Sequence, residues 1–244
     1  MAIIELNNVC KKYGLLQVTD KVSLSVGAGE ALGIIGPNGA GKTTIFNLIA
    51  GTVLPDSGAV SFDGLDVTHT PARQRCHRGI GRSFQIPHPF VGMTTYENVL
   101  VGATFGGCVS ERAGAAKAIE VLELTGLARK ANVLAGRLTL LERKRLEMAR
   151  ALASSPKLLL LDEIAGGLTE PECVELVAAI KSVRAEGVSI IWIEHVVHAL
   201  LAVVDRIAVI DFGRKIAEGD PAATMASPEV AAIYMGIEGE AVHG

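Results

Sequence analysis

The sequence predicts an α/β fold with a mostly parallel central sheet, an N-terminal antiparallel β subdomain and an inserted helical subdomain. Two strand-like runs open the chain, residues 3–9 and 17–26, and the second alternates apolar with polar side chains, which is typical of a half-buried antiparallel strand. Further along, short apolar runs are separated by helical stretches, as in a β-α-β arrangement. Between Pro87 and Leu152 this alternation stops and the pattern is helical.

Four compact apolar runs supply the expected central strands: residues 31–35, 158–161, 189–193 and 206–210. Continuous apolar strands of this length are typical of a parallel sheet that is buried on both faces. Residues 138–153 predict an amphipathic helix within the insertion, because their apolar side chains recur at helical spacing.

We therefore expect a single domain over residues 1–244. Its core comprises residues 1–86 and 153–244, and residues 87–152 form the helical subdomain.

The composition indicates a globular protein without a nucleic-acid partner. Hydrophobic residues make up 49% and charged residues 20% of 244 residues, which is typical of a chain with a sizeable core. The net charge of -3 gives no basic footprint for DNA or RNA. Four scattered cysteines predict neither a disulfide framework nor a compact metal site. We expect no secretory signal after Met1, and no apolar run approaches the ~20 residues of a membrane span. Membrane association must then come through a partner.

The strongest motif runs from Gly36 to Thr43 and matches G-x-x-x-x-G-K-[ST] between a predicted strand and a predicted helix. Its glycines let backbone N–H groups approach phosphate oxygens, and the helix N-terminus adds its positive dipole. Lys42 is expected to reach the β- and γ-phosphates, and the Thr43 hydroxyl to bind Mg²⁺. A turn that merely links strand to helix is the alternative, but chance rarely supplies all four fixed residues with these flanks. The residues expected to bind nucleotide here are Gly36, Pro37, Asn38, Gly39, Ala40, Gly41, Lys42, Thr43 and Thr44.

A second motif places two carboxylates, Asp162 and Glu163, at the end of the apolar run 158–161. Parallel sheets bind ligands at the carboxyl ends of their strands. Asp162 is expected to hold the Mg²⁺ shell, and Glu163 to orient the attacking water or take its proton. Read alone, such a pair is more often a helix cap or a solvated turn. Together with the phosphate loop it predicts a nucleotide-hydrolysing site.

From Leu6 to Gly236 the sequence resembles the ABC-type ATPases, which implies a P-loop ABC-type ATPase core that uses ATP and Mg²⁺. Tyr13, in Lys-Lys-Tyr-Gly, resembles the aromatic residue that stacks on adenine. Gln85 looks like the Q-loop glutamine, which contacts Mg²⁺ or the water, and His195 like the switch histidine at the γ-phosphate. The resemblance therefore implies that Glu163, His195 and Gln85 are catalytic, and that Thr43, Gln85 and Asp162 hold the metal. Without the resemblance, the ordinary interpretations are that Tyr13 packs near a turn, that Gln85 is a buried amide and that His195 is a polar group with its hydrogen bonds satisfied.

Two segments depart from the family pattern. The family's signature helix begins Leu-Ser-Gly-Gly-Gln and closes over ATP held by the other subunit of a dimer, whereas this chain has Leu138-Thr139-Leu140-Leu141-Glu142. Leu140 and Leu141 are expected to crowd that approach, and Glu142 adds a negative charge. After the carboxylates, Ile164 and Thr169 replace the usual Pro and Asp.

These departures leave two alternatives open. In the first, an asymmetric heterodimer, a second ATPase subunit supplies a better signature segment to the ATP bound by this chain. In the second, Thr139 and a small shift of the helix preserve function in a homodimer.

Residues 84–102 and the tail, including residues 212–219 and 234–236, resemble the ATPase subunits of branched-chain amino-acid importers. The resemblance implies an ATP-hydrolysing subunit at the cytoplasmic face of the cell membrane, bound to ABC transporter membrane subunits and served by an extracytoplasmic solute-binding protein. Related systems import urea, amides or other small polar solutes.

Two other function classes stay open. One is a regulatory ATP-binding subunit with little hydrolysis, which the altered segment Leu138 to Glu142 favours. The other is an ABC ATPase of translation or DNA maintenance, which the single cassette, the lack of a coiled-coil arm and the lack of a basic face oppose.

Overall fold

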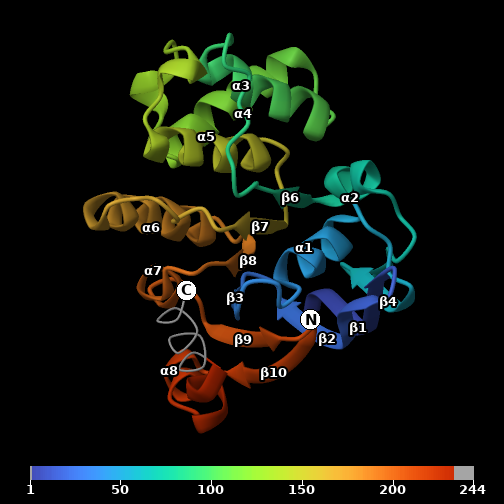
Figure 1. The fold of residues 1–244 in the computed structure, drawn as a ribbon. Helices are drawn as coiled ribbons and strands as arrows, with labels where there is room; N and C mark the ends of the chain where they lie inside the picture. Colours follow the sequence, from blue (N-terminus) through green and yellow to red (C-terminus); the bar gives the residue numbers. More distant parts are fainter. Residues whose placement is uncertain (1, 234–244) are drawn as a thin grey trace.

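The computed structural model describes residues 2–233 and contains two sheets flanked by helices (Figure 1). The smaller sheet is antiparallel, with strand order β2-β1-β4-β5. Its strands are β1 (Ala2–Tyr13), β2 (Leu16–Gly27), β4 (Ser57–Phe62) and β5 (Leu65–Asp66). The long β1–β2 hairpin confirms the antiparallel N-terminal strands that the sequence predicts.

The larger sheet has six strands in the order β10-β9-β3-β8-β7-β6. All of its pairings are parallel except that of β10 with β9. Its strands are β3 (Ala31–Ile35), β6 (Ile80–Arg82), β7 (Leu158–Asp162), β8 (Ser189–Ile193), β9 (Arg206–Asp211) and β10 (Arg214–Gly219). The four apolar runs of the sequence are its central strands, and β6 and β10 lie at its two edges.

The helices follow the strands in the order that a parallel sheet requires. The α-helices are α1 (Lys42–Ala50), α2 (Ala72–Arg78), α3 (Thr95–Val101), α4 (Glu111–Leu124), α5 (Leu140–Leu152), α6 (Glu170–Ala185), α7 (Val197–Leu201) and α8 (Pro221–Met225). Three short turns accompany them, a π-helical η1 (Gly102–Gly106) and the 3-10 helices η2 (Ala128–Lys130) and η3 (Ala135–Arg137).

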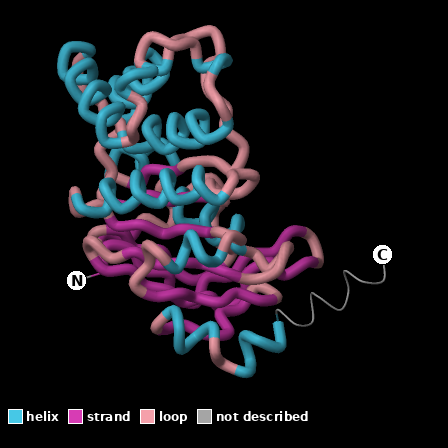
Figure 2. The backbone as a smooth tube through the Cα atoms, turned by 90° about the vertical axis from the view of Figure 1, so that its left-hand side faces the viewer, coloured by secondary structure: helices cyan, strands magenta, loops and turns pink. Residues whose placement is uncertain are grey.

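Two apolar clusters bury the two faces of the six-stranded sheet. Because side chains alternate along a strand, Leu158 and Leu160 of β7 point into one cluster and Leu159 and Leu161 into the other. The first cluster also contains α1 and the inner face of the antiparallel sheet. The second contains α5 and α6. In Figure 2 most of the helices lie above the strands. The sheet therefore holds α1 on one side and α5 on the other, and both helices border the site described below.

Helices α3, α4 and α5 form a separate group at the top of Figure 1. Helix α5 joins this group to the core because it also contacts β6 and β7. Its start differs from the expected residue 138: Leu138 is extended, Thr139 is the N-cap and the helix begins at Leu140. The Thr139 hydroxyl accepts a hydrogen bond from the Glu142 N–H and explains this boundary.

Candidate functional site

The glycine-rich loop lies between β3 and α1, where the sequence predicts it. Gly36 has φ 148°, and a Cβ atom there would lie 1.9 Å from the carbonyl oxygen of Ile210. Gly41 has φ 101°, and a Cβ atom there would lie 2.4 Å from the carbonyl oxygen of Val18. Both positions therefore need glycine for backbone conformation and for close approach to neighbouring strands.

Lys42 begins α1 and is only 5% exposed. Its ammonium group donates hydrogen bonds to the carbonyl oxygens of Gly36 (2.7 Å) and Pro37 (2.8 Å), so it curls back over the loop. Burial lowers the pKa of Lys42, and the nearby carboxylates of Glu163 and Asp162 oppose that shift. A cation held over inward-facing N–H groups suits an anionic ligand.

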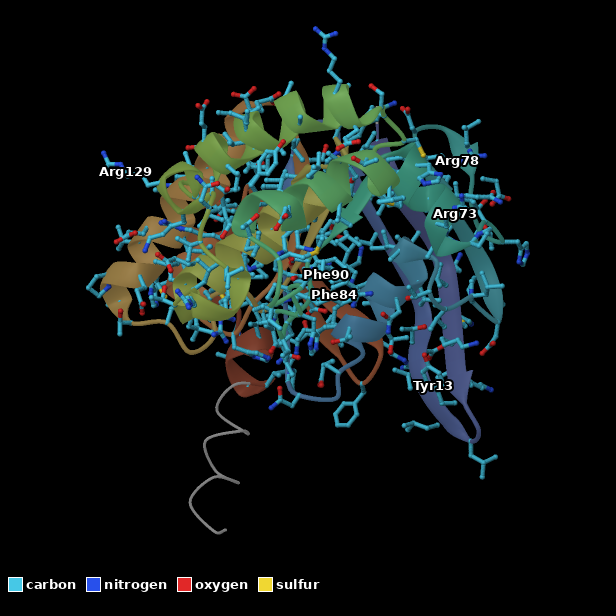
Figure 3. The ribbon with its side chains drawn as sticks, turned by 90° about the horizontal axis from the view of Figure 1, so that it is seen from above. Tyr13, Arg73, Arg78, Phe84, Phe90 and Arg129 are labelled. Atoms are coloured by element: carbon cyan, nitrogen blue, oxygen red, sulfur yellow. The ribbon has the colours of Figure 1, made fainter. Side chains whose placement is uncertain are left out.

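A cavity of about 310 Å³ opens beside this loop. Its lining combines the loop, the start of α1 and two of the predicted catalytic side chains: Val18, Asn38, Gly39, Ala40, Gly41, Lys42, Thr43, Thr44, Gln85 and Glu163. Tyr13 is not part of this lining. It ends β1, its side chain is 48% exposed, and the Lys11 ammonium lies 5.8 Å from its ring centroid (Figure 3).

Glu163 lies where three loops meet. One carboxylate oxygen accepts a hydrogen bond from the Gln85 amide nitrogen, and the other lies 2.7 Å from His195 Nε2. These residues follow β6, β7 and β8, which are parallel neighbours in the sheet and therefore end at the same edge. The structure thus brings together all three side chains that the sequence predicts to be catalytic.

Asp162, the last residue of β7, is 4% exposed. Burial raises the pKa of its carboxyl group, whereas Arg82 at 3.1 Å lowers it. Arg82 also donates a 2.6 Å hydrogen bond to Asn47 of α1. Sequence reasoning did not select Arg82, although it lies three residues before Gln85.

The predicted metal ligands have suitable chemistry for Mg²⁺, which prefers hard oxygen donors. Thr43 offers a hydroxyl group, Gln85 an amide oxygen and Asp162 a carboxylate. Thr43 and Gln85 line the cavity, and Asp162 is adjacent in sequence to the lining residue Glu163.

Comparisons with known proteins identify the family of the chain. The model of the ABC transporter family matches residues 19–166. The chain belongs to the ABC transporter family. It is 34% identical to the high-affinity branched-chain amino acid transport ATP-binding protein BraF of Pseudomonas aeruginosa, covering 96% of this chain and 98% of BraF. It is also 34% identical to the lipopolysaccharide export system ATP-binding protein LptB of Haemophilus influenzae, over 97% of this chain and 98% of LptB.

A solved ATP-binding cassette of an ABC transporter in its ADP conformation superposes with a TM-score of 0.88 at 32% identity, covering 97% of this chain and 99% of that one. The protein is thus the ATP-binding and ATP-hydrolysing subunit of an ABC transporter, and it has the ABC ATPase cassette fold. ABC ATPases dimerise and work with membrane subunits. Within residues 2–233, no helix has the length and apolar character to cross a membrane.

The signature segment of this ABC cassette, residues 138–142, differs in space from the expectation. Leu141 is only 7% exposed and packs into the core, so of the two leucines only Leu140 is exposed. A Cβ atom on Gly167 would lie 3.4 Å from the Leu140 side chain. The crowding expected from two leucines therefore reduces to one side chain, which lies against the loop that follows Glu163.

The charge of Glu142 is also compensated. Its carboxylate accepts a 2.9 Å hydrogen bond from the Thr139 N–H and lies 3.0 Å from the Lys130 ammonium. Partial burial would raise the pKa of Glu142, but these contacts lower it overall. The negative charge that the sequence predicts at Glu142 is therefore paired within the chain, where Glu142 closes a capping box at the start of α5.

A groove of about 190 Å³ lies between the core and the helical group of the cassette. Phe84, Arg82 and Arg150 are among its lining residues, and the Arg150 guanidinium lies 5.0 Å from the ring centroid of exposed Phe90 (Figure 3). Phe84 lines this groove and directly precedes Gln85, one of the side chains predicted to be catalytic.

Sequence reasoning missed two buried charges beside the catalytic cluster, Lys144 and Glu194. Lys144 stands in the run Arg-Lys-Arg, which indicates a solvated helix face, and Glu194 directly precedes His195. The one available signal was the placement of Glu194 at the end of an apolar strand, a position typical of site residues in parallel sheets.

Proposed function

We propose that this ABC subunit hydrolyses ATP at the cavity beside Lys42, with Glu163 as the residue that acts on the attacking water. The single observation that carries the proposal is the position of the Glu163 carboxylate, which lines the cavity and is held by Gln85 and His195. A carboxylate with two fixed partners is oriented to accept a proton from water as the water oxygen attacks the γ-phosphorus and ADP leaves. His195 and Gln85 set the γ-phosphate geometry.

The remaining residues hold the substrate in this proposal. The loop from Gly36 to Gly41 presents N–H groups to the phosphates, Lys42 pairs with their charge, and Tyr13 stacks on adenine. Thr43, Gln85 and Asp162 hold Mg²⁺, which neutralises phosphate charge when it is bound. The three ligands are oxygen donors of the type that this ion prefers.

The test is steady-state ATP hydrolysis by the purified chain with Mg²⁺ and saturating ATP. Glu163→Gln preserves shape and is expected to lower kcat by about 10²–10⁴-fold, while the affinity for ATP stays within about twofold. Glu186→Gln, at an exposed position at the end of α6, is the matched control and should leave kcat unchanged. Normal turnover in Glu163→Gln would reject Glu163 as the catalytic residue.

The same assay tests the dimer. We infer an asymmetric heterodimer, in which a second ATPase subunit closes the site of this chain, because Leu140 projects from the signature segment where the family has glycine. Binding of ATP without turnover by the chain alone, and turnover after the second ATPase is added, is the expected result. Robust turnover alone, abolished by Glu163→Gln, would instead support a homodimer. Binding without turnover under both conditions would support a regulatory subunit.

We infer that the groove between the core and residues 87–152 receives a helix of the membrane subunits, and that this contact holds the chain at the cytoplasmic face of the membrane. Its exposed aromatic side chain Phe84 precedes Gln85, and its side chain Arg82 pairs with Asp162. Movement of the bound helix therefore couples directly to two predicted site residues.

For the cargo we propose branched-chain amino acids or a related small polar solute, delivered by an extracytoplasmic solute-binding protein. The similarity to BraF over nearly the whole chain and the importer-like residues 84–102 support this. The equal identity to LptB favours lipopolysaccharide export as a second candidate.

Reconstitution with the membrane subunits separates the two. ATP-dependent accumulation of labelled leucine in vesicles supplied with the binding protein is expected, and it should vanish with Glu163→Gln. ATP hydrolysis stimulated by lipopolysaccharide, without leucine uptake, would support export.

A further inference from the structure

A buried carboxylate outside the predicted site ties two of its loops together. Glu194 directly follows β8 and is 1% exposed. One of its oxygens accepts a 2.8 Å hydrogen bond from the N–H of Ala165, and the other accepts from the N–H groups of His195 (2.9 Å) and Val196 (3.2 Å). Glu194 therefore links two backbone segments, the one that follows Glu163 and the one that carries His195.

A buried cation on helix α5 contacts the same stretch of backbone. Lys144 lies on α5, is 4% exposed and donates a 3.2 Å hydrogen bond to the carbonyl oxygen of Glu163. Burial lowers the pKa of Lys144, while the negative charges of Glu194 and then Glu163 oppose the shift. Lys144 thus contacts the carbonyl of residue 163 and Glu194 the N–H of residue 165, so two buried groups of opposite charge hold this short loop.

The loop needs such support because Glu163 is not in a relaxed conformation. Its φ of 46° lies in the left-handed region, which costs a residue with a Cβ atom about 1–2 kcal/mol. The Glu163 N–H donates a hydrogen bond to the Ile193 carbonyl oxygen at 2.8 Å. Hydrogen bonds therefore hold both the N–H and the carbonyl group of Glu163. This backbone conformation directs the side chain to Gln85 and His195.

We propose that Lys144 and Glu194 are positioning residues of the ATPase site, a buried pair of opposite charges that keeps the Glu163 backbone in its left-handed conformation and joins it to helix α5. The inference rests on the proposed role of Glu163. Since α5 begins with the signature segment, Lys144 gives that helix a direct contact with the catalytic residue of its own chain. A shift of α5 then changes the orientation of the Glu163 carboxylate.

The experiment compares Lys144→Met, Glu194→Gln and the double variant in the full chain, with its second ATPase present if turnover requires one. Glutamine keeps one acceptor oxygen but turns an amide toward an N–H group, so it breaks one of the two loop contacts. Each single variant is expected to lower kcat at least tenfold, while KM and the Kd for an ATP analogue stay within about twofold. Because the two charges interact, the double variant should lose less than the product of the two single losses.

The matched control is the ion pair of Arg145 on α5 and Glu175 on α6 (3.0 Å), which also joins α5 to a neighbouring element. Arg145→Met and Glu175→Gln should leave kcat within twofold. Lys144→Arg, which keeps the charge and a donor, should recover most of the activity that Lys144→Met loses.

Three outcomes overturn the inference: unchanged kcat in folded Lys144→Met and Glu194→Gln, an effect on KM alone, or fully multiplicative losses in the double variant. Urea unfolding identifies folded variants. If Glu194→Gln does not fold, Glu194→Asp replaces it, since its shorter side chain cannot hold both loops and unchanged kcat there has the same meaning. Normal turnover in Glu163→Gln would reject the proposed role of Glu163 itself, a result distinguishable from failure of the positioning pair alone.

Discussion

Replacing Arg75 by methionine should destabilise the protein strongly, although Arg75 lies outside the catalytic cluster. Arg75 is on α2, is fully buried and donates hydrogen bonds only to carbonyl oxygens: those of Leu48 (2.6 Å), Ile49 (2.9 Å), Thr68 (3.0 Å) and Thr70 (2.8 Å). Two of these acceptors belong to the last turn of α1, whose carbonyls have no partner within the helix. Burial lowers the pKa of Arg75 to about 10, so the side chain is still charged at pH 7.

The magnitude follows from the hydrogen bonds that the guanidinium group makes. Truncating one partner of a buried charged interaction costs about 3–5 kcal/mol, and methionine fills the space without supplying a donor to any of the four carbonyls. We therefore expect a decrease of about 4 kcal/mol in the free energy of unfolding and a fall in Tm of roughly 8–16 °C.

Urea denaturation followed by circular dichroism measures the change. The control is Arg73→Met, two residues earlier on the same helix, where the side chain is exposed and the expected change stays within about 0.5 kcal/mol. A decrease below about 1 kcal/mol for Arg75→Met, or one equal to that of Arg73→Met, would refute the reasoning.

Two further predictions concern the nucleotide site. Gly41→Ala places a Cβ atom 2.4 Å from the Val18 carbonyl oxygen at φ 101°, so it should cost about 3 kcal/mol of stability and weaken ATP binding at least tenfold. Gly39→Ala, at φ 79° with no atom within 4 Å of the new Cβ, should lower the free energy of unfolding by about 1 kcal/mol, measured by thermal denaturation. Equal losses of stability in the two variants would contradict the proposed clash of Gly41→Ala with Val18. Because burial raises the pKa of Asp162, its protonation stabilises the folded state at low pH, and this contribution disappears as pH rises through the folded pKa. Arg82→Met removes the neighbouring positive charge and should raise that pKa further, so Mg²⁺-ATP binding should weaken at a higher pH than in the unmodified chain; titrations from pH 7 to pH 5 with identical profiles would contradict this.

The sequence predicts the central sheet well because its strands are buried on both faces. The runs at residues 31–35 and 189–193 are β3 and β8 with the same boundaries, since a continuous apolar run with polar flanks has no other stable place in such a fold. The edge strands β6 and β10 escaped prediction. Ile-Gly-Arg and Arg-Lys-Ile-Ala-Glu-Gly have no apolar run, because β6 has only three residues and β10 is only partly buried.

The candidate site divides in the same way. The phosphate loop is contiguous in sequence and carries its own spacing rule, so its residues could be named directly. Gln85 and His195 are far from Glu163 in sequence, and only the resemblance to a known family singled them out. Lys144 had no signal of either kind, because a buried charge looks like a surface charge until the contacts of its neighbours are known. Glu194 had only its place after an apolar strand.

The signature segment shows how a departure in sequence can change meaning in space. Of its three unusual side chains, Leu141 is buried within the cassette and the carboxylate of Glu142 caps its own helix and pairs with Lys130. The electrostatic argument for an impaired partner site is therefore weaker, since the charge already has partners within the chain. The steric argument now depends on Leu140, which rests against Gly167. Because the Gly167 loop follows Glu163, a partner subunit that displaces Leu140 would also disturb the loop of the proposed catalytic residue, which links the proposed asymmetry of the dimer to the positioning of Glu163.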